Sequence, residues 1–326
     1  MARTVLVCGG AGYIGSHMVR MLAEHGHAVV VFDNLSTGHE AAVRAGNLVR
    51  GDLRDGYALR SVFSEWRFDA VFHFSGLIAV GESVAEPARY YDNNVAGTLN
   101  LLREMMAADV DRFVFSSTAA VYGNPRSDSL SEDQEPSPIN PYGRTKRITE
   151  DVLADYAAAY GLRSVSLRYF NAAGAHPDGT IGEAHDPETH LIPNVLFAAS
   201  GNRPPLDVFG DDYPTRDGTC VRDYIHVQDL CAAHLAALDW MSNRSGARVF
   251  NLGIGRGFTI LEVLEAARRV TGLPVPYRMS ARRQGDAAIL VADSARARAD
   301  LGWSPRHGDI EDIIDTAWRW HRDPKY

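Results

Sequence analysis

Tyr142 and Lys146 stand four residues apart, directly after Asn140-Pro141, at the head of a helical segment. Residues at i and i+4 share one face of a helix, so the Lys146 ammonium can lie beside the Tyr142 phenol. A neighbouring cation favours the phenolate and lowers the phenol pKa from its ordinary value of about 10. The pair therefore predicts a general base that takes a proton from a substrate hydroxyl. Considered alone, the pattern is a weak signal, and a solvated lysine beside a packing tyrosine is its commoner origin.

A glycine-rich loop follows the apolar run Val5–Cys8, which we expect to be a strand. Gly9, Gly12 and Gly15 form a G-x-x-G-x-x-G pattern that opens a helical segment. The glycines permit a tight turn, a close approach of backbone amides to a pyrophosphate, and close packing of helix on strand. The helix N-terminus favours the anion. Because the pattern lies between a strand and a helix, it predicts a dinucleotide site.

Asp33 ends the second apolar run, 18 residues after Gly15, and precedes Asn34-Leu35. A carboxylate at this place hydrogen-bonds the adenosine ribose hydroxyls and repels a 2′-phosphate, which favours NAD over NADP. Asp52-Leu53, after a third candidate strand, is a further candidate contact to the adenine, although Gly-Asp also suits an ordinary turn.

Strands that alternate with helices fill the first two thirds of the chain and predict a parallel sheet covered on both faces, a doubly wound α/β fold of Rossmann type. Helical periodicity marks Ile14–His25 and Val95–Ala108. The expected strands are Val5–Cys8, Ala28–Asp33, Ala70–Phe74, Arg112–Ser116, Ser164–Tyr169 and Arg248–Leu252.

The character of the chain changes after about Asn171, because Ala172–Thr189 is rich in Gly, Pro, His and Asp and reads as a long irregular loop. Helices are expected at Val227–Met241 and after Thr259, where Glu262 has capping-box spacing. We therefore predict a nucleotide-binding domain at 1–171, its sheet completed by about 227–255. A smaller mixed α/β substrate-binding domain would comprise 172–226 and 256–326.

The formal net charge of −8, without a basic block, makes nucleic acid or an anionic membrane an improbable partner. Cys8, Cys220 and Cys231 are an odd number without metal-site spacing, which argues against a disulfide framework. Met1-Ala2-Arg3 runs directly into an apolar strand without a leader pattern. We expect a cytoplasmic protein.

These motifs together resemble the extended short-chain dehydrogenase/reductases and, among them, the UDP-glucose (UDP-galactose) 4-epimerases. The resemblance covers nearly the whole chain in order. It is carried by Gly9–His17, Asp33-Asn34-Leu35, Phe74–Ser83, Tyr90–Val95, Ser116–Gly123, Pro141-Tyr142-Gly143, Arg168–Asn171, Asp212–Thr215, Val221–Val227, Asn251-Leu252-Gly253 and Arg282–Asp286.

The resemblance implies NAD-dependent epimerisation at C4 of a UDP-hexose through a transient 4-keto sugar. Tyr142, Lys146 and Thr118 would be catalytic. The NAD contacts would be Gly9, Gly12, Tyr13, Ile14, Gly15, Asp33, Asn34, Asp52, Leu53, Phe74, Gly76, Asn94 and Phe170, with Thr118, Tyr142 and Lys146. The UDP-sugar would be held by Asn171, His190, Leu191, Phe209, Arg222, Arg283, Asp286 and Leu290.

Three residues depart from the family pattern. Cys8 replaces the usual Thr, and Ser75 stands where Ala is common. Ile78 occupies a position that is often Lys, which removes one polar contact to the cofactor.

Nucleotide-sugar 4,6-dehydratases begin with the same oxidation but place an Asp-Glu pair after the Thr. Ala119 and Ala120 stand there in this chain and cannot shuttle protons. A non-catalytic NAD-sensing protein of the same fold would not need Tyr142, Lys146 and Thr118 together.

Glu183, His185, Asp186, Glu188 and His190 form a separate group with metal-ligand chemistry. Their spacing matches no standard zinc pattern, and the resemblance assigns this segment to the substrate pocket, so we expect no metal.

Two further expectations concern assembly and sugar size. Val95–Ala108 and Arg144–Tyr160 carry apolar residues beyond one stripe, and the family pairs these helices in a homodimer. The surplus residues are Leu101, Met105, Ile148, Val152 and Tyr156. Leu290 aligns with a position that is a bulky Tyr in some members, so it would leave room for an N-acetyl group. It also fits a plain buried strand residue.

Overall fold

Seven parallel strands form the larger sheet of the protein. A computed structural model describes residues 2–125, 127–283 and 286–326, so Gln284 and Gly285 of the Arg282–Asp286 motif lie outside the described residues. The strand order is β11-β7-β5-β4-β1-β2-β3. Their bounds are β1 Thr4–Cys8, β2 Ala28–Asp33, β3 Asn47–Arg50, β4 Ala70–His73, β5 Arg112–Thr118, β7 Arg163–Tyr169 and β11 Ala247–Leu252. The six expected strands are confirmed to within two residues at each end.

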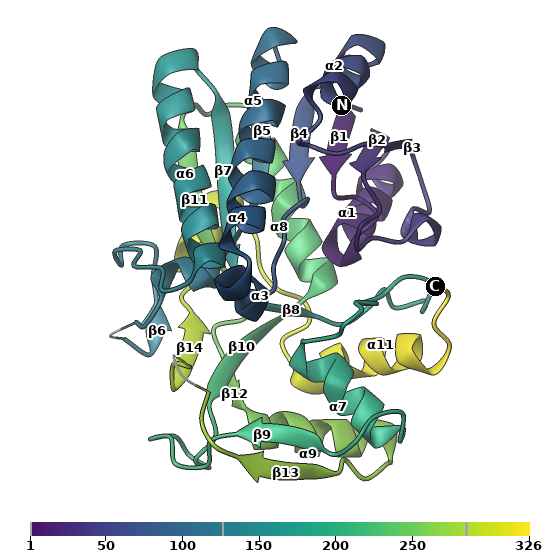
Figure 1. Cartoon of the computed structure of the whole chain (residues 1–326), viewed down its shortest axis with the longest axis vertical. Helices are drawn as coiled ribbons and strands as arrows, with labels where there is room; N and C mark the ends of the chain where they lie inside the picture. Colours follow the sequence, from purple (N-terminus) through teal and green to yellow (C-terminus); the bar gives the residue numbers. More distant parts are fainter. Residues whose placement is uncertain (1, 126, 284–285) are drawn as a thin grey trace.

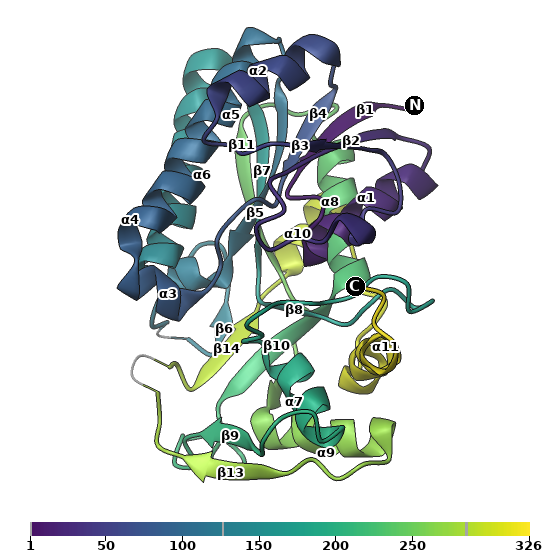
Figure 2. The same cartoon turned by 45° about the vertical axis from the view of Figure 1, so that its right-hand side comes forward.

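Helices cover both faces of this sheet, which explains why its strands are continuous apolar runs rather than alternating ones. Val5, Leu6 and Val7 are fully buried, with Val5 and Val7 in one core cluster and Leu6 in another. The helices on one face are α1 (Tyr13–Glu24), α8 (Val227–Trp240) and α10 (Ala295–Leu301), and on the other α2 (Gly56–Glu65), α5 (Gly97–Ala107) and α6 (Pro141–Tyr160) (Figure 2). The doubly wound fold is confirmed.

The segment expected to be one helix from Val95 to Ala108 is longer and less regular than predicted. It begins with α3 (Val80–Ala85) and α4 (Pro87–Tyr90), continues through a π-helical turn, η2 (Tyr91–Ala96), and ends with α5. Leu101 and Met105, which we expected on a partner-facing surface, are fully buried in the protein's own core with Leu102. That expectation is wrong, because periodicity does not tell which of two apolar rows faces the sheet.

The smaller part lies beyond the carboxyl ends of the large sheet (Figure 1). Its central strand is β10 (Val221–His226), which pairs with β8 (Asn171–Ala173), β12 (Gly257–Thr259) and β14 (Ile289–Ala292). The strand β6 (Ser129–Leu130) extends this sheet beyond β14, and β9 (Leu206–Phe209) pairs with β13 (Tyr277–Ser280). The helices α7 (Leu191–Ala199), α9 (Ile260–Thr271) and α11 (Ile310–Arg322) supply much of the second core.

The expected capping box is confirmed, because Thr259 and Glu262 bond each other's backbone at the start of α9. Of the segment Ala172–Thr189 that was predicted to be irregular, the first two residues belong to β8, and residues 174–189 are irregular. The two parts are interleaved: α8 and β11 return to the large sheet, and β6 joins the small one. The division at about residue 171 stays a prediction. Within the described residues, no helix combines the length and hydropathy that crossing a membrane requires.

Candidate functional site

The glycine loop connects β1 to α1 and lies directly against the end of β4. Gly9 has a φ of +80°, and a Cβ there would lie 2.6 Å from the Phe74 carbonyl carbon. A Cβ on Gly15 would lie 2.0 Å from the Gly9 carbonyl oxygen. Only glycine fits at these two positions. The α1 N-cap, Gly12, offers no side-chain cap to the first N–H groups of the helix, which suits this end to bind an anion.

Asp33 joins the end of β2 to the glycine loop. Its two carboxylate oxygens accept backbone N–H bonds, from Ala11 at 2.9 Å and from Leu35 at 2.8 Å. Burial raises the pKa of this carboxyl, and the two N–H bonds oppose the rise. Asp33 therefore orders the turn from which Asn34 projects.

Asn34 reaches the third strand's loop, where its Nδ2 donates to Asp52 at 2.8 Å. Arg54 also binds Asp52, with an Nε–Oδ1 distance of 2.9 Å and an Nη2–Oδ2 distance of 2.7 Å. Leu53, between them in the chain, is buried. Sequence reasoning did not consider Arg54 as a cation near the ribose end of the site. Its guanidinium is engaged by the Asp52 carboxylate, which weakens it as a receptor for a 2′-phosphate.

The loop after β4 carries Phe74 and Gly76 toward α6. The Phe74 ring lies 4.9 Å from the His234 ring, and a Cβ on Gly76 would lie 2.8 Å from Lys146 Nζ. Asn94, in η2, holds the loop in place: its Oδ1 accepts from Leu77 N at 2.9 Å, and its Nδ2 donates to Leu77 O at 3.0 Å. The structure thus uses the Asn94 amide to position this loop.

Tyr142, Lys146 and Thr118 meet at the end of β5. Asn140 caps α6, because its side-chain oxygen accepts the Gly143 N–H at 2.8 Å. Tyr142 is the first buried residue of this helix. All three side chains are at most 9% exposed. Burial raises the pKa of the Tyr142 phenol, and a hydrogen bond with Thr118 partly opposes the rise.

The expected lowering of the Tyr142 pKa by Lys146 is therefore not found in the protein alone. Lys146 Nζ lies 6.0 Å from the centre of the Tyr142 ring and donates at 2.8 Å to the Ser116 carbonyl. Helical spacing places the two residues on one face of α6, but the Lys146 ammonium is directed toward the Ser116 carbonyl of β5, to which it donates. Burial lowers the pKa of Lys146 to about 8, against the opposing effect of the Glu150 carboxylate.

Glu150 is a site residue that sequence reasoning missed, although it stands four residues after Lys146 on α6. It is 5% exposed and accepts from Ser117 Oγ at 2.6 Å and from Arg168 Nε at 2.8 Å. A second bond runs from Arg168 Nη2 to Glu150 Oε2. This carboxylate balances the charge of the buried Arg168 guanidinium, and it favours the charged form of the buried Lys146 ammonium. Its i+4 spacing from Lys146 was the available signal.

The expected diphosphate-binding residues gather around β9, β10 and the segment before β14. The Arg283 guanidinium lies 3.9 Å from the centre of the Phe209 ring. Arg222 Nη2 is 3.6 Å from Asp286 Oδ1, and Arg222 Nη1 donates to the Ala287 carbonyl at 2.9 Å.

The remaining expected substrate residues come from three elements. Asn171, in β8, donates from Nδ2 to the Asp223 carbonyl at 2.8 Å, and His190 and Leu191 begin α7. Leu290, in β14, is half-buried and packs against the cluster of Val121, Tyr122 and Leu130. Its backbone register pairs it with Arg222.

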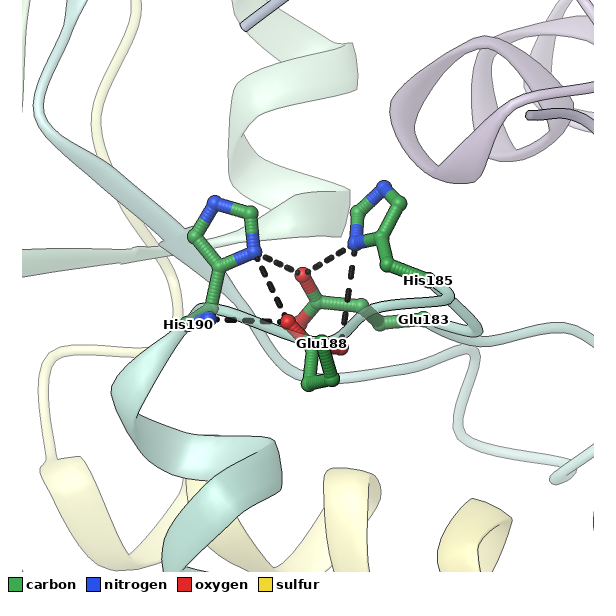
Figure 3. A group of neighbouring side chains, drawn as sticks. All are labelled: Glu183, His185, Glu188 and His190. Atoms are coloured by element: carbon green, nitrogen blue, oxygen red, sulfur yellow. Dashed lines mark hydrogen bonds and ion pairs between the residues drawn. The ribbon is translucent and has the colours of Figure 1, made fainter. Parts of the chain in front are cut away.

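The segment 183–190 brings four of the five proposed metal-ligating residues together; the fifth, Asp186, is not among them (Figure 3). His190 Nδ1 lies 2.8 Å from Glu183 Oε1 and 3.1 Å from Glu188 Oε1. His185 Nδ1 lies 3.1 Å from Glu183 Oε1 and 3.7 Å from Glu188 Oε2. Burial opposes protonation of both imidazoles, but the two carboxylates outweigh it and raise the pKa of His185 to about 9 and of His190 to about 10.

Comparisons with known proteins agree with one another. Residues 5–253 match a family described as the NAD dependent epimerase/dehydratase family. The chain is 52% identical to a UDP-glucose 4-epimerase of Rhizobium meliloti over 317 residues, which cover 97% of this chain and 96% of that protein. A UDP-glucose 4-epimerase from Brucella ovis in complex with NAD superposes with a TM-score of 0.95 at 51% identity, covering 97% and 98% of the two chains. The enzyme from Bifidobacterium longum in complex with NAD+ and UDP gives 0.93 at 40% identity, covering 98% of each chain.

Proposed function

Because the chain belongs to the NAD-dependent epimerase/dehydratase family, we propose that it interconverts UDP-glucose and UDP-galactose by NAD-dependent epimerisation at C4. The observation that carries the proposal is the convergence of Thr118, Tyr142 and Lys146 at the carboxyl end of β5, where doubly wound sheets bind ligands. They lie on the same edge of the sheet as the glycine loop.

The residues present fit NAD. The close approach of Gly9 to Phe74 and the uncapped start of α1 suit a pyrophosphate, and Asp33 with Asn34 suits a ribose. Tyr13, Ile14, Asp52, Leu53, Gly76 and Phe170 are the further contacts that we propose. When bound, NAD supplies a hydride acceptor that is regenerated within each catalytic cycle.

In this proposal Tyr142 takes the proton of the sugar 4-hydroxyl, and Thr118 orients the phenol through their hydrogen bond. Because burial raises the phenol pKa, we infer that the phenolate forms when positive charge enters the site, as an oxidised nicotinamide would bring. Lys146, held by the Ser116 carbonyl, is placed to bind the nicotinamide ribose.

Arg222, Arg283 and Phe209 are proposed to anchor the uridine diphosphate, because guanidinium groups suit phosphate oxygens. Epimerisation requires the 4-keto sugar to turn and present its other face. Anchoring at the diphosphate, with few contacts to the sugar, leaves it free to do so.

Two observations count against the alternatives. Ala119 and Ala120, which open the 3-10 turn after Thr118, have no proton to move, so a 4,6-dehydratase would lack its acid and base. A non-catalytic sensor would not require a tyrosine, a threonine and a lysine buried together.

Incubation of the purified protein with UDP-galactose, without added NAD, tests the proposal. We expect UDP-glucose to accumulate to equilibrium, because retained NAD is regenerated in each cycle. A protein that releases NAD on denaturation and yet converts none of UDP-glucose, UDP-galactose or their N-acetyl counterparts would contradict the proposal.

Sugar size is tested by the same assay. Leu290 is half-buried against the cluster of Val121, Tyr122 and Leu130, against which Ala119 and Phe170 also pack, so we propose that a larger ring there would crowd the site. We expect the wild type to turn over UDP-N-acetylglucosamine and Leu290→Tyr to lose that activity while keeping UDP-glucose turnover. Absence of N-acetyl turnover by the wild type would instead fit Leu290 as a plain strand residue.

We further propose a homodimer formed through α5 and α6. With Leu101 and Met105 in the core, the apolar residues left on this surface include Ile148, which is 36% exposed, and the half-buried Val152 and Tyr156. Light scattering at micromolar concentration should give twice the mass of one chain, and Ile148→Glu should lower it toward the monomer. Tyr277→Glu, at an exposed apolar residue of β13, is the control that should leave the mass unchanged. A monomeric wild type would refute the dimer.

A cytoplasmic location stays a prediction; the three cysteines are unpaired and buried, which agrees with it.

A further inference from the structure

Glu183, His185, Glu188 and His190 each turn one atom toward a common centre (Figure 3). The four ligand atoms all lie within 4.8 Å of one another. Both histidines present Nδ1 to the carboxylates, and their Nε2 atoms point away from them. Glu183 and Glu188 are 4% and 6% exposed, so both carboxylates are removed from water.

Glu183 Oε1 is within ion-pair distance of both imidazoles, yet its direction to them is not that of a hydrogen bond. It is a buried oxygen without a hydrogen-bond partner among the described residues, and His185 Nδ1 is a buried nitrogen in the same condition. Leaving a buried polar atom unpaired is costly, and for a charged group more so. A cation between the four atoms would satisfy both.

We propose that these four side chains form a binding site for one divalent cation, and that Zn²⁺ is the ion it prefers. Two imidazole nitrogens and two carboxylate oxygens are ligands that zinc accepts, usually in tetrahedral geometry with bonds of about 2.0 Å. Such a tetrahedron has edges of about 3.3 Å. The nitrogen–oxygen separations here run from 2.8 to 3.7 Å when either oxygen of Glu188 is counted, and all four ligand atoms lie within 4.8 Å of one another. Mg²⁺ and Ca²⁺ prefer oxygen ligands alone.

Charge balance is consistent with this assignment, because one divalent cation neutralises the two buried carboxylates. Without a metal, the same balance requires two imidazolium ions, and the cluster would then be an ion-pair network. A substitution in the cluster would destabilise a metal site and an ion-pair network alike, so a loss of stability does not distinguish them. The metal content of the protein and its response to added metal do.

All four ligands belong to the segment 183–190, so the ion would fix the path of this segment, which contacts its neighbours through other atoms. The Glu183 carbonyl accepts from Trp320 Nε1 of α11 at 2.9 Å, and Asn194 of α7 donates to the His190 carbonyl at 2.8 Å. The His185 ring lies 6.3 Å from the ring of Tyr13, the first residue of α1. A histidine that binds metal through Nδ1 carries its proton on Nε2. An ion bound to Nδ1 of His190 would therefore hold the imidazole ring in one orientation and leave Nε2 as a hydrogen-bond donor.

Elemental analysis of protein purified without added metal tests the site directly. We expect close to one zinc per chain in the wild type and at least a tenfold lower content in two variants. Glu183→Gln keeps the side-chain shape and removes the carboxylate ligand, and His185→Asn replaces the imidazole ligand with a smaller amide. His176→Asn is the matched control. It removes a histidine of the irregular residues 174–190 that lies outside the cluster and pairs with Asp178 at 2.7 Å, and the variant should retain the zinc.

Wild-type protein dialysed against a chelator supplies a second test that needs no variant. Zinc at about 100 times its Kd should raise Tm by about 5 °C, and magnesium should not. If the protein is purified without metal and its Tm does not respond to zinc, the proposal is wrong and the cluster is an ion-pair network. Neither measurement uses UDP-sugar turnover, so this result is independent of the proposed reaction.

Discussion

Tyr142→Phe is expected to lower kcat for UDP-galactose by about 10²–10⁴-fold, the usual contribution of a general base, while NAD stays bound. The phenyl ring fills the same buried volume, since Tyr142 is only 9% exposed, so the substitution removes the hydroxyl and leaves the packing. Thr118→Val should also slow turnover, because it removes the hydrogen bond to the phenol. Steady-state kinetics measures the loss of turnover in each variant, and the nicotinamide content of the purified protein shows whether NAD stays bound.

Tyr160→Phe is the matched control for this experiment. It removes a phenol from the same helix, α6, where the side chain is 67% exposed and far along the helix from Thr118. Wild-type kcat is expected. Were Tyr142→Phe to keep more than about a tenth of wild-type turnover, Tyr142 would not be the base.

Glu150→Gln is expected to lower the free energy of unfolding by about 3–5 kcal/mol, which is typical when one partner of a buried ion pair is removed. The side chains of Glu150 and Arg168 are each 3% exposed, and the change leaves the Arg168 guanidinium without a countercharge. It also removes the carboxylate that favours the charged form of Lys146. Urea denaturation with linear extrapolation measures the loss.

Asp151→Asn, one residue further along α6, supplies the comparison for Glu150→Gln. Asp151 pairs with Arg147 at 2.6 Å, but the two side chains are 55% and 37% exposed. An exposed pair of this kind contributes about 1 kcal/mol or less. Equal losses in the two variants would show that burial of the Glu150–Arg168 pair does not matter.

The features predicted correctly from the sequence are those set by neighbouring residues. The strand Val5–Cys8, the glycines after it and the capping box at Thr259 are local patterns, and each was confirmed in place. The direction of Lys146 was not predictable in this way. It depends on a carbonyl 30 residues earlier in the chain, on a strand that packs against α6.

Two further differences have the same origin. The sequence shows two apolar rows between Val95 and Ala108, and only the packing against α2 and β5 puts Leu101 and Met105 in the core. The cluster at Glu183 matches no metal spacing, because the irregular path of residues 183–190, rather than a regular element, brings its four side chains together.

The late return of β11 to the large sheet has a consequence for the synthesis of the protein. The strand β7 ends at Tyr169, but its outer neighbour is complete only at Leu252. At a synthesis rate of about 5–20 residues per second, the edge of β7 stays unpaired for roughly 4–17 s. An unpaired strand edge invites pairing with other chains. The nascent chain is therefore most exposed to aggregation while residues 170–252 are being made, and we expect chaperone contacts to concentrate in that interval.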